Sequence, residues 1–81
     1  MNPSRISVED VAVASALRAR VGARLVRLRQ RARLSQRDLS RESGVSIVSI
    51  WRIEAKGTWP SAEVAVALAR TLQTTAERLL K

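Results

Sequence analysis

The sequence predicts an all-α protein, built as a compact bundle of five helices, or of six if the first long helix breaks near Gly22. Three observations support this fold class. Apolar residues recur at three- and four-residue steps over most of the 81 residues. Serine or threonine stands directly before several of these stretches, where a helix N-cap is favoured. The alternating apolar and polar pattern of a half-buried strand is not evident.

The first helix is predicted to start at Val8, because Ser7 and Asp10 have the spacing of a capping box. Its core-facing stripe is expected to comprise Ala14, Leu17, Val21, Leu25, Leu28 and Ala32. A basic stripe beside it comprises Arg20, Arg24, Arg27 and Arg31. This stripe is either a solvated face or a source of phosphate contacts.

A third side of the first helix has small and apolar side chains that let another helix approach closely. These residues are Val8, Val11, Ala12, Ser15, Ala19 and Gly22. The approaching helix is expected to be either the N-terminal helix of a second subunit or the C-terminal helix of the same chain.

Residues 35–55 contain two short predicted helices joined by a tight turn. Ser35 can cap the first helix and Ser46 the second. Gly44 lies at the reversal between them, where a left-handed backbone favours glycine. Core positions are expected at Leu39, Val45, Ile50 and Ile53. A short helix, a glycine turn and a second helix with an exposed face form the layout of a DNA-binding helix-turn-helix.

The C-terminal part is predicted to add two more helices. After a connecting loop at 56–60, Ser61 caps a helix whose buried side comprises Val64, Ala65, Leu68 and Leu72. A short last helix carries Leu79 and Leu80. Its cap is either Thr74, together with Glu77, or Thr75 alone.

The helix-turn-helix stretch resembles the XRE family, the Cro and phage-repressor type of this motif. The matching positions are Leu34, Gln36, Leu39, Ser40, Gly44, Val45, Ser46, Ile50, Ile53 and Glu54. The resemblance extends over residues 21–80 and implies a phage-repressor-like fold within a single domain, 1–81. Residues 1–20 then form an N-terminal extension. The departures from the family pattern are Ser40 for alanine, Lys56-Gly57 for a glycine-first order, and Trp51 for a small or polar residue.

The net charge of +8, with fifteen basic residues of which thirteen are arginine, indicates a polyanionic partner. The sequence contains no cysteine, histidine or tyrosine, which argues against disulfides, thiolate zinc sites and the usual general base. No catalytic, cofactor or metal site is expected, and the protein is predicted not to be an enzyme. The sequence has neither a membrane-spanning apolar run nor the apolar block of a signal peptide, so a cytoplasmic location is expected.

The N-terminal end of the second motif helix is expected to enter the DNA major groove. Predicted base-contacting residues are Ser46, Ile47, Val48, Ser49 and Arg52. Arg52 is the first candidate for a bidentate bond to guanine, with a phosphate contact or a salt bridge to Glu54 or Glu42 as alternatives. Ile47 and Val48 are expected to touch thymine methyl groups or, alternatively, the protein's own core.

Predicted phosphate-contacting residues are Gln36, Arg37, Arg33, Lys56 and Thr58. For Gln36 this role is also what the family resemblance implies. Trp51 is expected to be exposed near the DNA backbone or clasped by arginine side chains. Trp59 is expected to be an interface residue, a core residue or a loop anchor.

These observations predict a sequence-specific regulator of transcription that binds double-stranded DNA. A repressor that reads an inverted-repeat operator as a homodimer is favoured, with the N-terminal helix, Trp59 and the C-terminal helix as candidate interface elements. Two alternatives remain at this point. One is an antitoxin that also binds DNA, and the other is a protein that packages nucleic acid without sequence preference.

Overall fold

The computed structural model describes residues 5–81, so the first four positions of the predicted extension lie outside the described residues. The helices are α1 (Val8–Arg31), α2 (Gln36–Ser43), α3 (Ile47–Lys56), α4 (Ala62–Thr71) and α5 (Ala76–Leu80). No strand occurs between residues 5 and 81. The predicted all-α class is confirmed with five helices, since α1 continues unbroken through Gly22.

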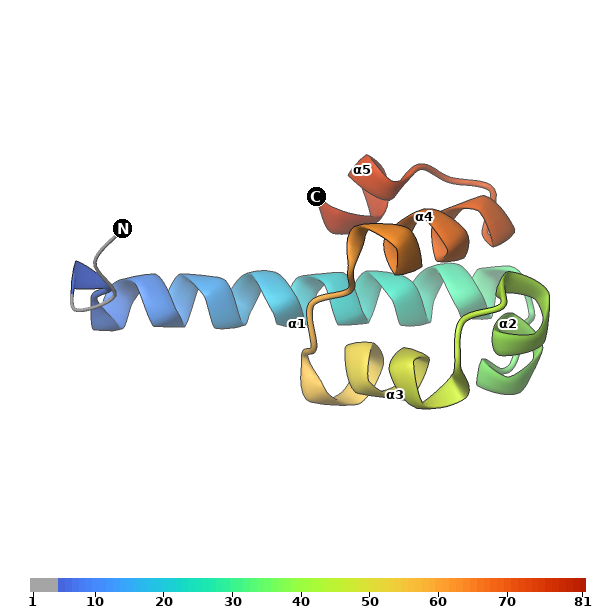
Figure 1. Ribbon diagram of the computed structural model, residues 1–81, viewed down its shortest axis with the longest axis horizontal. Helices are drawn as coiled ribbons and strands as arrows, with labels where there is room; N and C mark the ends of the chain where they lie inside the picture. Colours follow the sequence, from blue (N-terminus) through green and yellow to red (C-terminus); the bar gives the residue numbers. More distant parts are fainter. Residues whose placement is uncertain (1–4) are drawn as a thin grey trace.

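Helix α1 is the long axis of the molecule (Figure 1). Helix α3 lies along one side of its C-terminal half, α4 and α5 lie on the other side, and α2 closes the end. The N-terminal half of α1 extends beyond all the other helices. Within residues 5–81, no helix is both long and apolar enough to cross a membrane.

Local hydrogen bonds set the helix starts where the sequence predicts them. Ser7 and Ser35 each accept a bond from the backbone N–H three residues later, and the aspartate at that position closes a capping box. Ser46 and Ser61 cap α3 and α4 in the same way, without the second bond. Thr75, and not Thr74, caps α5.

The core lies between the C-terminal half of α1 and the four shorter helices. Its largest fully buried side chains are Leu25, Leu39, Ile50, Leu68, Leu79 and Val21. The predicted core stripe of α1 is correct at Val21 and Leu25, with Leu28 partly buried. It is wrong at Leu17, which is 38% exposed, and at Ala32. Leu17 lies one turn before Val21, the first buried residue of α1, and Ala32 is the C-cap in the turn that ends α1.

Gly22 is a point of close contact between α1 and α3. A Cβ atom at this position would lie 2.6 Å from the carbonyl oxygen of Ile53, far inside van der Waals contact. The small-residue side of α1 therefore packs, at Gly22, on α3 of its own chain. Neither expected partner, the C-terminal helix nor a second subunit, occupies this position.

Arg24 belongs to the predicted basic stripe, but its side chain forms hydrogen bonds that join α1 to α5. Its Nη1 atom donates to the carbonyl oxygens of Arg78, at 2.9 Å, and Lys81, at 2.6 Å, with a longer bond to Leu79. These carbonyls end a helix and lack intrahelical partners, so a cation satisfies them well. The other members of the stripe, at positions 20, 27 and 31, are exposed.

Candidate nucleic-acid interface

The turn between α2 and α3 is held by side chains as well as by glycine. Gly44 adopts the left-handed conformation, with φ 81°, and ends α2. The Ser40 hydroxyl donates to the carbonyl oxygen of Val45 at 2.6 Å, and the Ser43 hydroxyl accepts from the Val45 N–H. The family departure at Ser40 is thus explained, because its hydroxyl bonds the turn that follows. This turn fixes the direction in which α3 leaves α2.

Helix α3 has one buried side and one exposed side. Ile50 and Ile53 are buried, as predicted. Ile47 is 40% exposed and Val48 50% exposed, although both are β-branched apolar residues. Arg52 is also exposed. An apolar strip with one arginine therefore faces outward from the helix that the sequence predicts to read DNA.

The predicted base contacts at Ser46 and Ser49 bond to each other. The Ser46 hydroxyl accepts from the Ser49 N–H and donates to the Ser49 hydroxyl at 2.9 Å. Ser46 is exposed, whereas Ser49 is partly buried. The pair stands beside Ile47 and Val48 at the N-terminal end of α3, so four of the five predicted base contacts lie together, with Arg52 further along the helix.

An ion pair between Arg29 and Glu54 joins α1 to α3. The guanidinium makes two bonds to the carboxylate, of 2.8 and 3.0 Å, and the two side chains are only 14% and 5% exposed. The hydrogen bonds to Glu54 raise the pKa of Arg29 above its usual value, against the opposing effect of burial. Arg29 also donates to the carbonyl oxygen of Leu34, at 3.0 Å, in the turn before α2.

Gln36 adds α2 to this network, since its amide Nε2 donates to Glu54 at 2.9 Å. One carboxylate thus fixes the first residue of α2 relative to the last turns of α1 and α3. The sequence predicts a phosphate contact for Gln36. In the structure the side chain is partly buried and has one of its amide protons in this bond, which leaves the second proton for another acceptor.

The other predicted phosphate contacts lie at the two ends of the helix-turn-helix. Arg33 and Arg37 are exposed beside the start of α2, and Arg33 has a left-handed backbone with φ 61°. Lys56 and Thr58 are exposed at the end of α3. Gly57 caps α3 with φ 67°, so the chain after Lys56 ends the helix by the glycine geometry expected of a C-cap.

Trp51 lies on the exposed flank of α3 and is 44% exposed. Of the two predicted alternatives, a ring clasped by arginine is wrong, because a lysine covers it, with the Lys56 Nζ atom 5.4 Å from the ring centroid. The exposure agrees with the other alternative, whose position near the DNA backbone stays a prediction. Trp59 is 45% exposed in the loop between α3 and α4. Both indoles remain half exposed, and the core cluster formed within residues 5–81 contains only aliphatic side chains.

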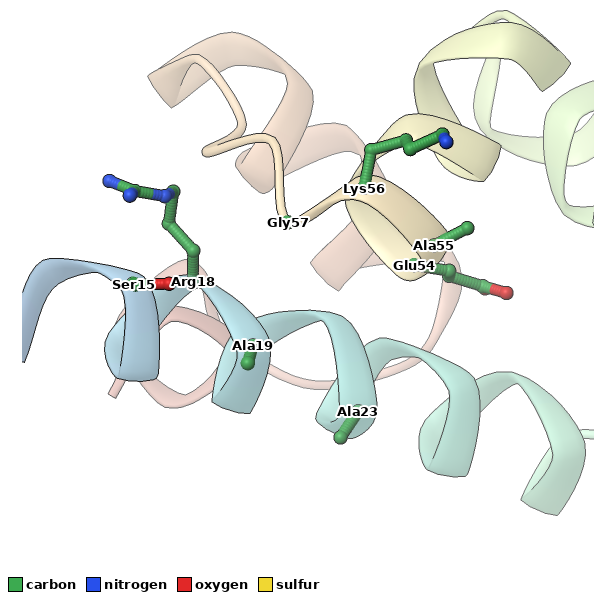
Figure 2. Close-up of a pocket in the computed structure, with 8 residues that line it drawn as sticks. All are labelled: Ser15, Arg18, Ala19, Ala23, Glu54, Ala55, Lys56 and Gly57. Atoms are coloured by element: carbon green, nitrogen blue, oxygen red, sulfur yellow. The ribbon is translucent and has the colours of Figure 1, made fainter. Parts of the chain in front are cut away.

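A groove separates α1 from the end of α3 (Figure 2). Small residues of α1 form one wall, and the backbone from Glu54 to Gly57 forms the other. Figure 2 shows Arg18 and Lys56 on opposite walls, with their charged ends directed away from each other. Sequence reasoning does not identify Arg18 as a site residue. The available signal is Gly22, because contact with α3 there brings the preceding turn of α1 to the end of α3.

The comparison with protein families identifies the same helix-turn-helix motif. Residues 20–80, most of the chain, match a family model described as a helix-turn-helix domain. Searches of curated proteins and of solved structures gave no match. The matched region contains α2, the Gly44 turn and α3 in the order that the motif requires. The chain therefore belongs to the helix-turn-helix domain family, a family of DNA-binding domains.

Proposed function

We propose that the protein is an XRE-type transcriptional repressor in the cytoplasm that binds an inverted-repeat operator as a homodimer. The N-terminal end of α3 enters the major groove of each half-site. The observation that carries this proposal is the exposed strip of α3, where Val48 and Arg52 lie opposite the buried Ile50 and Ile53. A stable helix whose outward side offers apolar contacts and one guanidinium fits a groove lined by base edges.

Arg52 reads a guanine in this proposal. The ion pairs formed among residues 5–81 are Arg29 with Glu54 and Arg41 with Asp38. Glu54 is therefore already occupied, which disfavours the alternative in which it pairs with Arg52. Ile47 and Val48 contact thymine methyl groups, because their exposed side chains have no hydrogen-bonding atoms.

Backbone contacts position the protein on either side of α3. At the start of α2, the free amide proton of Gln36 and the cations at Arg33 and Arg37 bind phosphates of one strand. At the end of α3, Lys56 and Thr58 bind phosphates across the groove. Arg18 joins this second set, because it lines the same groove as Lys56, on the opposite wall.

Selection from random duplex DNA, followed by footprinting, tests this proposal. We expect a two-fold symmetric site with half-sites one helical turn apart. Arg52→Ala should weaken binding to the selected site by about 1–3 kcal/mol and leave random duplex nearly unaffected. Arg41→Ala is the matched control, since it removes an exposed arginine from α2. Equal weakening on both DNAs, or no preferred site at all, contradicts specific readout by Arg52.

A further inference from the structure

The N-terminal half of α1 is a largely apolar segment that the rest of the chain leaves mostly exposed, apart from the side with Ser15, Arg18 and Ala19 that lines the groove with α3. Val8 is 86% exposed, Val11 56% and Val13 60%. Figure 1 shows this part of α1 projecting away from every other helix. We call residues 8–20 the arm. A helix of this length has only marginal stability in water on its own. The exposure of its valine side chains to water is also unfavourable. A partner surface that buries these valines would therefore stabilise the arm.

We propose that the arm pairs in antiparallel orientation with the arm of a second copy of this chain. The pairing deepens the proposed homodimer by naming its interface, and it rests on the proposed function in that respect. The charges along the arm select this partner. Glu9 and Asp10 lie near its beginning, whereas Arg18 and Arg20 lie near its end.

Antiparallel pairing brings these opposite charges together at both ends of the interface. With the centre between Ala14 and Ser15, Glu9 of each copy lies level with Arg20 of the other. Parallel pairing would set carboxylate against carboxylate and guanidinium against guanidinium, which is destabilising. The two carboxylates also disfavour the DNA backbone as the surface that covers the beginning of the arm.

The side chains of the arm suit a close approach of two helices. Between its valines stand small residues, namely Ala12, Ala14, Ser15, Ala16 and Ala19. Interaxial distance depends on the side chains at the contact, so such a helix can approach its partner closely while the valines fill the flanks. The arm is about 20 Å long, which makes the interface small. We therefore expect self-association that is weak without DNA.

Self-association of charge-reversal variants, measured by sedimentation without DNA, tests the antiparallel orientation of the arms. Glu9→Arg and Arg20→Glu should each weaken self-association about tenfold or more, since each variant replaces two attractions by two repulsions. The double variant E9R/R20E should restore it. Glu63→Arg makes the same charge change on the exposed face of α4 and is expected to have no effect. A wild-type chain that stays monomeric, or a double variant weaker than both single variants, overturns the proposal.

Disulfide trapping tests the location. The chain contains no cysteine, so a single introduced thiol reports only its own position. Ala16→Cys, which lies near the centre of the paired arms on the same side of α1 as Glu9 and Arg20, should form a covalent dimer under mild oxidation. Val66→Cys places a thiol on the 56% exposed apolar face of α4 and should not. Efficient trapping through V66C, with none through A16C, would move the interface to α4 and overturn the proposal.

These measurements separate the interface from the function. A chain that is monomeric in both assays but still binds a selected site through Arg52 refutes only the arm pairing. A chain that dimerises through its arms but shows no sequence preference refutes only the proposed repressor.

Discussion

Replacing Glu54 by glutamine tests whether one carboxylate holds the helix-turn-helix in place. Glu54 accepts three hydrogen bonds, two from Arg29 and one from Gln36, at distances between 2.8 and 3.0 Å. Glutamine has nearly the same shape, so the substitution removes the charge without opening a cavity. It also turns one acceptor into a donor that faces other donors.

We expect Glu54→Gln to lower the free energy of unfolding by about 3 kcal/mol. Removing one partner of a buried ion pair costs about 3–5 kcal/mol, because the remaining charge stays buried without compensation. The lower end applies because Arg29 retains some exposure, at 14%, and because the amide oxygen still accepts one bond. For a chain of this size, the melting temperature should fall by about 12–24 °C.

Urea and thermal unfolding followed by far-ultraviolet circular dichroism measure this effect. Arg41→Ala is the control, because it breaks the exposed pair with Asp38 and should leave the unfolding midpoint nearly unchanged. The double variant R29M/E54Q should be less destabilised than the sum of its two single variants, since no charge is then left unpaired. A destabilisation by Glu54→Gln as small as that of the control, or strict additivity, would refute the reasoning.

Three further predictions concern the helix contact, the cap and the DNA backbone. Gly22→Ala places a Cβ 2.6 Å from the Ile53 carbonyl, so α1 and α3 must separate, and thermal melts should show a destabilisation of about 1–3 kcal/mol; an unchanged melt would contradict the close contact. The Ser35 backbone N–H lowers the pKa of Asp38, so its carboxylate stabilises the fold above the unfolded-state pKa of about 3.9, and this contribution is lost as the pH falls through the lower folded pKa. Asp38→Asn should therefore destabilise at neutral pH and converge with the wild type in urea titrations once the pH has fallen through the folded-state pKa of Asp38; a constant difference would argue against the cap. Arg37→Gln should remove one phosphate contact and so reduce the slope of log K against log salt for operator binding by about 0.9, measured by fluorescence anisotropy; an unchanged slope would remove Arg37 from the interface.

The helix starts can be predicted because their determinants are local. Ser7 with Asp10 and Ser35 with Asp38 are three residues apart, and each pair forms the capping box that its spacing predicts. The turn at Gly44 is equally local, since its φ of 81° is a property of one residue.

The extent of the core cannot be predicted from the same pattern. Periodicity identifies which side of α1 is apolar, but it contains no information on where neighbouring helices stop covering that side. It therefore assigns Leu17 to the core, although this residue is 38% exposed and lies one turn before Val21, the first buried residue of α1. Gly22 likewise indicates a close helix contact, but not that α3 makes it.

Most of the network behind the candidate site also depends on contacts between residues far apart in the sequence. Glu54 is a natural partner for an arginine, but thirteen arginines compete for that role. Only the fold selects Arg29, which is distant in the chain and follows the buried Leu25 by one turn of α1. Arg24 shares a stripe with exposed arginines, whereas the fold directs it to the end of α5. On α3, the burial of Ile50 and Ile53 is predicted by the sequence, and it leaves the opposite side of the helix exposed. Contact of the exposed side chains with bases stays a prediction.

The continuity of α1 through Gly22 has a consequence for the spacing of the operator. If the arms pair about Ala14 and Ser15, the same rigid helix acts as a ruler between two DNA-reading units. The two contacts at Gly22 then lie about 22 Å apart along the arms. Each α3 helix extends outward from there by about 10 Å, so the N-terminal ends of the two helices lie about 42 Å apart. The roughly 34 Å of one DNA turn falls between these two separations. Inserting about eleven residues, three turns of helix, between the arm and Gly22 would keep the rotational phase and lengthen the ruler by about 33 Å. Half-site spacing in this protein would then be a property encoded in the length of one helix.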